Sequence, residues 1–220
     1  MQAPIRHYSS REKYALLYAD QFMIVLSKPS RLLSVPGRGE DKQDCLITRL
    51  QLEYPDALIV HRLDYDTSGL LAIARGKEMH RRLSICFQDR QVEKRYIAVI
   101  EGQLEHAAGE VNLPLLVDWP NRPLHKVDFE AGKPSLTLYK RLSYDAKTNT
   151  SRVELTPETG RTHQLRVHMQ ALGHPILGDP LYADATAKAK ADRLLLHAEH
   201  LALKHPESGE SLSFTSPSPF

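Results

Sequence analysis

The chain has 220 residues, of which 41% are hydrophobic and 25% charged, and its formal net charge at pH 7 is only +2. This composition is typical of an ordinary folded globular protein and excludes collagen-like repeats and extensive disorder. The sequence contains neither an apolar run of bilayer length nor the apolar core of a secretory signal, which favours a cytoplasmic protein with no membrane partner. Cys45 and Cys86 lie far apart in helix-like patterns, so we expect small buried hydrophobic residues rather than a disulfide.

The first part of the chain is expected to alternate short strands with helices. Residues 1–13 are polar and aperiodic, which predicts a flexible tail. Apolar spacing then predicts two short strands, a loop, a helix that starts from an Asp44 N-cap and ends before Pro55, and a third strand. The strands are expected at 16–18, 22–27 and 58–60. A polar turn at 61–69, an apolar strand at 70–74 and a helix at about 77–90 with a basic outer face follow.

The second part begins with a strand at 96–100 and a long connection at 113–134, which holds four prolines and shows little pattern. Further along, the sequence predicts strands at 135–142 and 151–156, a helix at 162–172 capped by Thr162, and closing strands at 193–204 and 211–214. This order of elements predicts an α+β fold, with a largely antiparallel mixed sheet flanked by helices and loops. We expect one domain over residues 14–220.

The densest polar segment is HRLDYDTSG at 61–69, which lies between two apolar strands. Polar groups at strand ends are common in functional sites. Taken alone, however, this composition is also typical of an ordinary turn in which Asp66 and Thr67 bond to nearby backbone and Gly69 supplies conformational freedom. Both interpretations stay open on the local sequence.

A second polar segment, ETGRTHQLRVH, runs from Glu158 to His168 and enters a predicted helix. The amino terminus of a helix favours an anion, and the guanidinium groups of Arg161 and Arg166 can bind a carboxylate or phosphate. A third segment, Lys94-Arg95-Tyr96, carries an aromatic residue after two bases. In both segments the alternative is structural: the arginines are solvated and the tyrosine belongs to the core.

The spacing of residues does not match the motifs of metal-dependent or nucleotide-binding enzymes. The His197-Ala198-Glu199 triplet has the form found in zinc deaminases, but no Pro-Cys-x-x-Cys follows it. His163 and His168 are five residues apart and do not share a helix face in the way a zinc-binding pair does. The sequence has no nucleophile elbow, phosphate-binding loop or dinucleotide fingerprint. We therefore expect no metal and no cofactor.

Four motifs occur in order along the chain: HRLDYDTSG, KRY, TGRTHQLRVHMQALGHPILGD and RLLLHA. In this order the sequence resembles the RluA family of pseudouridine synthases over residues 14–216. The resemblance implies the pseudouridine synthase fold and cofactor-free isomerisation of uridine in structured RNA. Because the sequence leaves no room for an amino-terminal S4 RNA-binding domain, it is most similar to the short members of the family, which act on stem-loops of both ribosomal and transfer RNA.

The resemblance also implies a role for individual residues. Asp64 matches the essential aspartate, which attacks the nucleoside or assists departure of the base. Arg166 matches the arginine that forms an ion pair with this aspartate, and Tyr96 matches the tyrosine that stacks on the flipped uracil. Leu196 matches the apolar residue on the other side of the base. Arg62 matches the side chain that fills the gap left by the flipped nucleotide.

Further RNA contacts are expected from two basic blocks, 61–96 and 120–175, where basic residues outnumber acidic ones. The candidate contacts are Arg38, Arg81, Arg82, Arg122, Lys126 and Arg161. We expect the enzyme to act as a monomer. An RNA-binding or RNA-folding module that has lost catalysis is the main alternative, and the presence of Asp64, Tyr96 and Arg166 counts against it. A metal-dependent deaminase or hydrolase is a third possibility, which a metal assay alone would separate from the other two.

Overall fold

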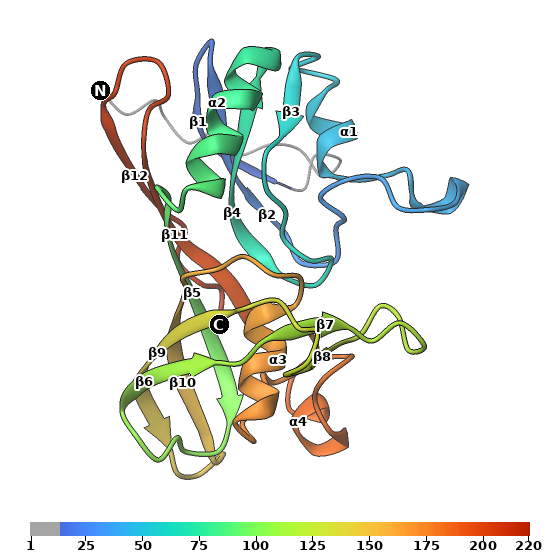
Figure 1. Cartoon of the computed structure of the whole chain (residues 1–220), viewed down its shortest axis with the longest axis vertical. Coiled ribbons are helices and arrows are strands. Elements are labelled where there is room, and N and C mark those ends of the chain that lie inside the picture. Colours follow the sequence, from blue (N-terminus) through green and yellow to red (C-terminus); the bar gives the residue numbers. More distant parts are fainter. Residues whose placement is uncertain (1–13) are drawn as a thin grey trace. The chain divides into compact units, whose positions relative to one another are not determined.

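The computed structural model describes residues 14–220, so the predicted tail at 1–13 lies outside the described residues. The chain falls into two compact units, whose elements are labelled in Figure 1. Among the described residues, unit 1 contains 14–94 together with Ala198–Pro219, and unit 2 contains Arg95–His197 with Phe220. Both units are built on antiparallel strands with a few short helices, which confirms the predicted α+β class.

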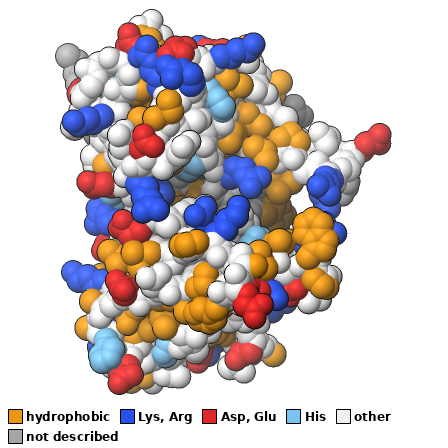
Figure 2. Space-filling model, in the orientation of Figure 1, with side chains coloured by type: hydrophobic (Ala, Val, Ile, Leu, Met, Phe, Trp, Pro, Cys, Tyr) orange, Lys and Arg blue, Asp and Glu red, His pale blue; other side chains and the backbone are white. Residues whose placement is uncertain are grey.

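Charged side chains of both signs are mixed on the surface. On the face shown in Figure 2, Lys and Arg side chains lie at several separate places, with Asp and Glu among them. This distribution agrees with the small net charge of the sequence.

In the residues that the structure describes, unit 1 contains six strands, two α-helices and one 3₁₀ turn. The strands are β1 (Ala15–Ala19), β2 (Met23–Lys28), β3 (Ala57–Ile59), β4 (Ser68–Arg75), most of β11 (Leu196–Lys204) and β12 (Ser211–Thr215). The helices are α1 (Leu46–Leu50) and α2 (Gly76–Gln88), and the 3₁₀ turn η1 spans Glu40–Lys42. β2 pairs antiparallel with β1 and β4, β3 pairs with β4, and β11 pairs with β12.

The centre of unit 1 is apolar on both faces of β2 and β4. Val25 and its cross-strand neighbour Ala72 belong to one core cluster with Met79 and Leu83, which form the apolar stripe of α2. Ile24 points to the opposite face, because successive residues of a strand alternate, and it is fully buried as well. Burial on both faces explains why these two strands read as unbroken apolar runs in the sequence.

Unit 2 contains a four-stranded antiparallel sheet, a two-stranded hairpin and two helices. The sheet has the order β5-β10-β9-β6, from β5 (Glu93–Glu101), β10 (Thr150–Pro157), β9 (Leu136–Asp145) and β6 (Ala108–Asn112). The hairpin pairs β7 (Leu115–Val117) with β8 (His125–Val127), and the helices are α3 (Gln164–Ala171) and α4 (Ala185–Ala189). The long proline-rich connection predicted at 113–134 thus contains the hairpin.

Two predicted helix starts were wrong by one residue. Cys45 rather than Asp44 is the N-cap of α1, because the Cys45 N–H donates to Thr48 Oγ1 at 3.2 Å while Asp44 Oδ1 accepts from Arg49 Nε at 2.6 Å. The N-cap of α3 is His163 rather than Thr162, and its left-handed backbone, with φ 56°, turns the chain into the helix. Strands β6, β7 and β8 and helix α4 were not predicted.

The side chain of His61 fixes the start of the polar turn between β3 and β4 through one hydrogen bond and one ring contact. β3 ends at Ile59, and beyond it the ring Nε2 of His61 accepts the N–H of Ala72 at 3.0 Å, in place of a backbone carbonyl. The ring stacks on Phe87 with a centroid distance of 4.2 Å. Burial, with a contribution from the positive charge of Lys94, lowers the pKa of His61 to about 3. The imidazole is therefore a neutral acceptor at physiological pH.

This arrangement makes stability depend on pH. Because the pKa of His61 is about 3 in the folded chain against 6.5 for an ordinary histidine, the unfolded chain binds more protons between these values. We expect the stabilisation from neutral His61 to be complete above pH 6.5 and to be lost progressively as the pH falls toward 3. Urea unfolding across this range should show a shallower pH dependence for His61→Asn than for the wild type. His106→Asn, which removes an exposed histidine, is the control, and equal slopes for wild type and His61→Asn would contradict the account.

Candidate active site

Asp64 lies in unit 1, in the turn between β3 and β4. The side chain of Ser34 binds both backbone hydrogen-bonding groups of the preceding residue, Leu63. The hydroxyl of Ser34 donates to the carbonyl of Leu63 at 2.7 Å and accepts the N–H of the same residue at 3.2 Å. Leu63 itself is 6% exposed, so its side chain anchors the turn in the core. The backbone that leads into Asp64 is thus fixed by hydrogen bonds and by packing.

The residues after Asp64 are held by the same segment of unit 1. The carbonyl of Tyr65 accepts the N–H of Leu32 at 3.2 Å and the ammonium of Lys28 at 3.3 Å. The carbonyl of Asp66 accepts the hydroxyl of Ser30 at 2.7 Å. Lys28 is almost fully buried, and its ammonium also donates to the carbonyls of Pro29 and Leu32. Segment 28–34 therefore clamps the turn on both sides of Asp64.

Gly69 shows why the turn has to end in glycine. Its φ is +114°, a conformation that residues with a side chain rarely adopt. A Cβ atom built on Gly69 would lie 2.3 Å from the carbonyl oxygen of Ala198 in β11, so there is no space for a side chain. The residues just before Gly69, Thr67 and Ser68, are buried. The Gly69 end of the turn therefore packs against β11, and this part of the turn is buried rather than exposed to solvent.

The side chains of the turn divide between the interior and the surface. Leu63 and Thr67 point inward and are buried, Asp64 is half-buried, and Arg62 and Tyr65 are exposed. A half-buried carboxylate on a fixed backbone is suited to act on a bound substrate, because it loses little entropy in reaching its reactive position. Arg62, two residues earlier, is exposed and can contact the same substrate from outside.

Arg166 lies in unit 2, on α3, and is bound to a residue that sequence reasoning missed. Its Nε donates to Asp179 Oδ2 at 2.8 Å and its Nη2 to Asp179 Oδ1 at 2.7 Å, so the pair is bidentate. The two side chains are 2% and 1% exposed. Asp179 Oδ1 also accepts the N–H groups of Leu181 and Tyr182. Removal of either partner would leave a buried charge without its counter-charge, at a cost of about 3–5 kcal/mol.

The ion pair between Arg166 and Asp64, which the family resemblance implies, would join residues of different units and stays a prediction. The observed pair assigns Nε and Nη2 of Arg166 to Asp179. A guanidinium group carries five N–H donors, so the bond to Asp179 does not use up its capacity. The role of Asp179 is to fix the plane of that group.

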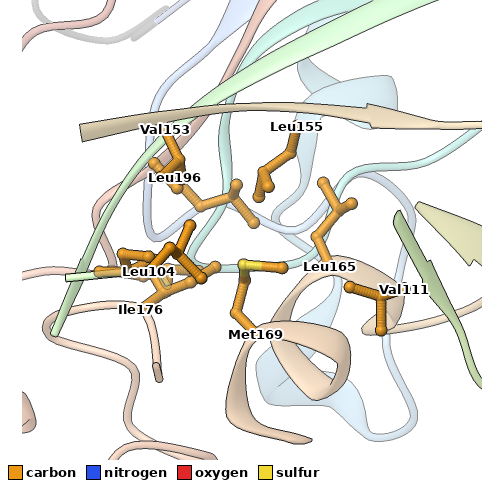
Figure 3. Close-up of a cluster of buried hydrophobic side chains, with 11 residues drawn as sticks. Leu104, Val111, Val153, Leu155, Leu165, Met169, Ile176 and Leu196 are labelled. Carbon is orange, nitrogen blue, oxygen red and sulfur yellow. The ribbon is translucent and has the colours of Figure 1, made fainter. Parts of the chain in front are cut away.

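Leu196 belongs to the main cluster of buried apolar side chains in unit 2, and Tyr96 packs against this cluster. Tyr96, on β5, is half-buried and packs against the cluster of buried side chains drawn in Figure 3, which includes Leu196. In this view Leu165 and Met169 of α3 point toward Val153 and Leu155 of β10, and Leu196 lies in the same cluster. The cluster gives Tyr96 a rigid apolar support, which a ring that stacks on a base requires.

Helix α3 is fixed to the sheet by a directed chain of hydrogen bonds. Gln164 Nε2 donates to Thr137 Oγ1 at 3.0 Å, and Thr137 Oγ1 lies 2.9 Å from His168 Nδ1. The other ring nitrogen, His168 Nε2, lies 3.0 Å from the carbonyl of Leu113, which can only accept. Nε2 of His168 therefore carries a proton, which it donates to Leu113, and burial lowers the pKa of this histidine. The polar residues that surround Arg166 in sequence thus set the position of the helix.

The predicted RNA contacts differ in their surroundings. Arg38 and Arg161 are exposed, and Arg161 Nε donates to the carbonyl of Pro134. Arg81 and Arg82 both bind Glu78, and Arg82 binds Glu207 as well. Lys126 lies 3.4 Å from Asp128, and the Arg122 guanidinium lies 4.0 Å from the centroid of the Trp119 ring. Intrahelical pairs hold the two arginines of α2, which leaves less of their charge for a phosphate.

Sequence reasoning missed the residues that support the site: Lys28, Ser34, Asp179 and Tyr182. The only sequence signal for Asp179 was its position: it is the single acidic residue of the stretch GHPILGD and stands at its end. Among residues 14–220 we find no group of three His, Cys, Asp or Glu side chains that could bind a metal ion. None of the helices in this part of the chain is long and apolar enough to cross a membrane.

Comparison with known sequences shows the family to which the chain belongs. The sequence profile described as RNA pseudouridylate synthase matches residues 22–171. The chain is 52% identical over 205 residues to the dual-specificity RNA pseudouridine synthase RluA of Escherichia coli strain K12, and the match covers 93% of each protein. The protein of the same name from Yersinia pestis is 50% identical over 199 residues, which is 90% of this chain and 96% of that protein.

Solved structures give the same result. Human RNA pseudouridylate synthase domain containing 1 superposes with a TM-score of 0.79 at 29% identity, and the match covers 98% of this chain and 87% of that one. Human RNA pseudouridylate synthase domain containing 4 superposes with a TM-score of 0.74 at 26% identity, covering 93% and 88%. The fold is therefore that of the pseudouridine synthases, as the motifs predict. The profile and the relatives together show that this chain belongs to the RNA pseudouridylate synthase family.

Proposed function

We propose that this enzyme isomerises uridine to pseudouridine in stem-loops of both ribosomal and transfer RNA. The high identity to relatives named as dual-specificity synthases, over nearly their whole length, supports two RNA substrates. The observation that carries the catalytic assignment is the clamped turn, in which segment 28–34 fixes the backbone on both sides of Asp64. A carboxylate that has to attack or stabilise a sugar carbon needs this kind of preorganisation.

The proposed reaction breaks the bond between N1 of the uracil and C1′ of the ribose and forms a bond between C5 and C1′. The proton on C5 leaves and N1 gains one, so the reaction is balanced without an oxidant, a reductant or a cofactor. Asp64 acts by attack at C6, by attack at C1′, or by assisting elimination to a glycal, and all three routes use the same carboxylate.

The other site residues receive complementary roles. Arg166, held in its plane by Asp179, keeps the Asp64 carboxylate ionised and oriented. Tyr96 stacks on one face of the flipped uracil and accepts or relays a proton, and Leu196 covers the other face. Because Asp64 belongs to one unit and the other three residues to the second, we propose that both units form the single catalytic domain predicted over residues 14–220.

Recognition is proposed to rest on base flipping and on local contacts. Unstacking a base costs a few kcal/mol, and phosphate contacts with stacking offset that cost. Arg62 is exposed on the clamped turn and fills the gap left by the flipped nucleotide. Arg38, Arg122, Lys126 and Arg161, together with Arg81 and Arg82 of α2, bind phosphates. The enzyme acts as a monomer in the cytoplasm, and needs no metal.

The first test concerns Asp64. Asp64→Asn should abolish product formation and leave RNA affinity within about three-fold of the wild type, because it removes the nucleophile and almost no contact surface. Tritium release from RNA labelled at C5 of uridine, measured under single-turnover conditions, reads out the chemistry. Asp66→Asn is the matched control two residues away and should retain turnover. Near wild-type release by Asp64→Asn would remove this residue from the mechanism and favour a binding module that has lost catalysis.

The second test concerns Arg62. Arg62→Ala should lower the rate for bound RNA by about ten-fold or more and weaken binding far less, because its proposed task begins only after the nucleotide has flipped. Rate constants at saturating enzyme, compared with dissociation constants from filter binding, separate the two effects. Weaker binding with an unchanged rate for bound RNA would show that Arg62 is only a docking contact.

The third test concerns the size of the substrate. If the catalytic domain reads local shape through phosphates and stacked bases, a short anticodon-type hairpin with a target uridine should be modified nearly as well as full-length RNA. Affinity should fall steeply between about 50 and 200 mM salt. Binding and turnover of both RNAs across this range measure the two properties. Inert hairpins alongside reactive ribosomal particles would contradict this account of recognition.

A further inference from the structure

Tyr182 lies where three parts of unit 2 meet. It follows Asp179 by three residues, is 6% exposed, and forms a small core cluster with Leu115 of β7 and Val167 of α3. Leu124 and Val127, from the segment that forms the rest of the β7–β8 hairpin, pack against this cluster. The Tyr182 ring therefore joins the hairpin to the helix that carries Arg166.

The hydroxyl of Tyr182 makes two further connections. It accepts the backbone N–H of His125, the first residue of β8, at 2.9 Å, and it lies 2.6 Å from Nδ1 of His163 at the start of α3. Since the oxygen accepts from His125, its own hydrogen can be donated to His163. The rings of His125 and His163 are also in edge-on contact, with centroids 5.2 Å apart. One hydroxyl group thus links the hairpin to the helix terminus by hydrogen bonds.

Tyr182 also contacts both members of the buried ion pair. Its N–H donates to Asp179 Oδ1 at 3.1 Å, and the centre of its ring lies 5.1 Å from Cζ of Arg166. An aromatic ring at this distance attracts a guanidinium group and restricts its tilt. A change in the position of Tyr182 therefore alters the two groups that set the orientation of Arg166.

The hairpin at the other end of this connection has the chemistry of an RNA-contacting element. We call residues 115–127, which comprise β7, β8 and the loop between them, the arm; Figure 1 shows its loop extending away from α3. Trp119 in this loop is 65% exposed, and Arg122 covers one face of its ring. An exposed ring paired with a guanidinium group can stack on an unpaired base and bind a phosphate.

We propose that Tyr182 is a positioning residue that couples the seating of the arm to the orientation of Arg166. This inference rests on the proposed roles of Arg166 in catalysis and of the arm in RNA binding. RNA bound at the loop holds the arm in place, the arm holds the Tyr182 hydroxyl through the His125 N–H, and the Tyr182 ring and N–H hold the Arg166–Asp179 pair. The ring packs against apolar side chains of the arm, and the hydroxyl adds a directed hydrogen bond to its backbone, so we assign the coupling to the hydroxyl.

Tyr182→Phe tests the connection, since it keeps the ring beside Arg166 and removes only the hydroxyl. We expect the single-turnover rate constant for bound stem-loop RNA to fall at least about ten-fold, because the variant loses both hydrogen bonds of the hydroxyl and the loss of one buried hydrogen bond can have about this effect. RNA affinity should fall only a few-fold. Tyr144→Phe is the matched control, because it removes an exposed tyrosine hydroxyl that donates to Asn149 in the same unit, and it should behave as the wild type.

Trp119 supplies a second readout, because it is the single tryptophan of the chain and lies in the arm. In Tyr182→Phe without RNA, acrylamide should quench its fluorescence more strongly than in the wild type, and saturating stem-loop RNA should reduce the difference. A purely structural role would not give this pattern: partial unfolding lowers the amplitude of the single-turnover reaction and leaves the rate constant of the folded molecules unchanged.

The outcomes separate this inference from the proposed function. Arg166→Lys keeps a charge but loses the planar bidentate group, and it should stop turnover if the proposed role of Arg166 is right. Inactive Arg166→Lys together with a wild-type rate constant for Tyr182→Phe would overturn the coupling and leave the proposed function intact. A slow Tyr182→Phe with unchanged Trp119 quenching would overturn it too, because the arm would not be involved. Active Arg166→Lys would instead refute the proposed role of Arg166.

Discussion

The bidentate pair between Arg166 and Asp179 is the interaction on which unit 2 depends. A guanidinium group that is 2% exposed is tolerated only because a carboxylate of equal burial lies within hydrogen-bond distance of two of its nitrogens. Asp179 is in turn held by backbone N–H groups of the turn that follows it, so the turn, the helix and the charge are fixed together. The pair thus stabilises unit 2 and orients the guanidinium group of Arg166 at the same time, so a substitution of Asp179 that removes one effect also removes the other.

Unit 1 fixes its turn largely through bonds to the backbone. The backbone on either side of Asp64 is held through carbonyl and N–H groups by Ser30, Leu32 and Ser34, and by the buried ammonium of Lys28. Backbone bonds of this kind fix the direction of the Cα–Cβ bond of Asp64. In the proposed mechanism the two units contribute different things: unit 1 carries the proposed reactive carboxylate, and unit 2 carries the residues proposed to orient it and to stack on the base.

The sequence predicted the elements whose pattern is local. Strand β4 and helix α2 were found because they are long apolar or amphipathic runs, and Gly69 and Asp64 stood out in a dense polar turn. Strands β7 and β8 were missed because three-residue strands between prolines have no periodicity, and the start of α3 was misplaced because His163 adopts a left-handed backbone that favours no particular cap. The family resemblance supplied the roles of Asp64 and Arg166. The supporting role of Asp179 could not be read from spacing, since it depends on a tertiary contact thirteen residues away.

The division of the chain between the two units has a consequence for how the protein forms during synthesis. Unit 2 is built from one continuous stretch apart from Phe220, so all its sheet strands are available once His197 has left the ribosome. Unit 1 has to wait for Ala198–Pro219, because these residues supply most of β11 and all of β12, and Ala198 packs directly on Gly69. The segment that carries Asp64 is thus translated well before the residues that complete its unit.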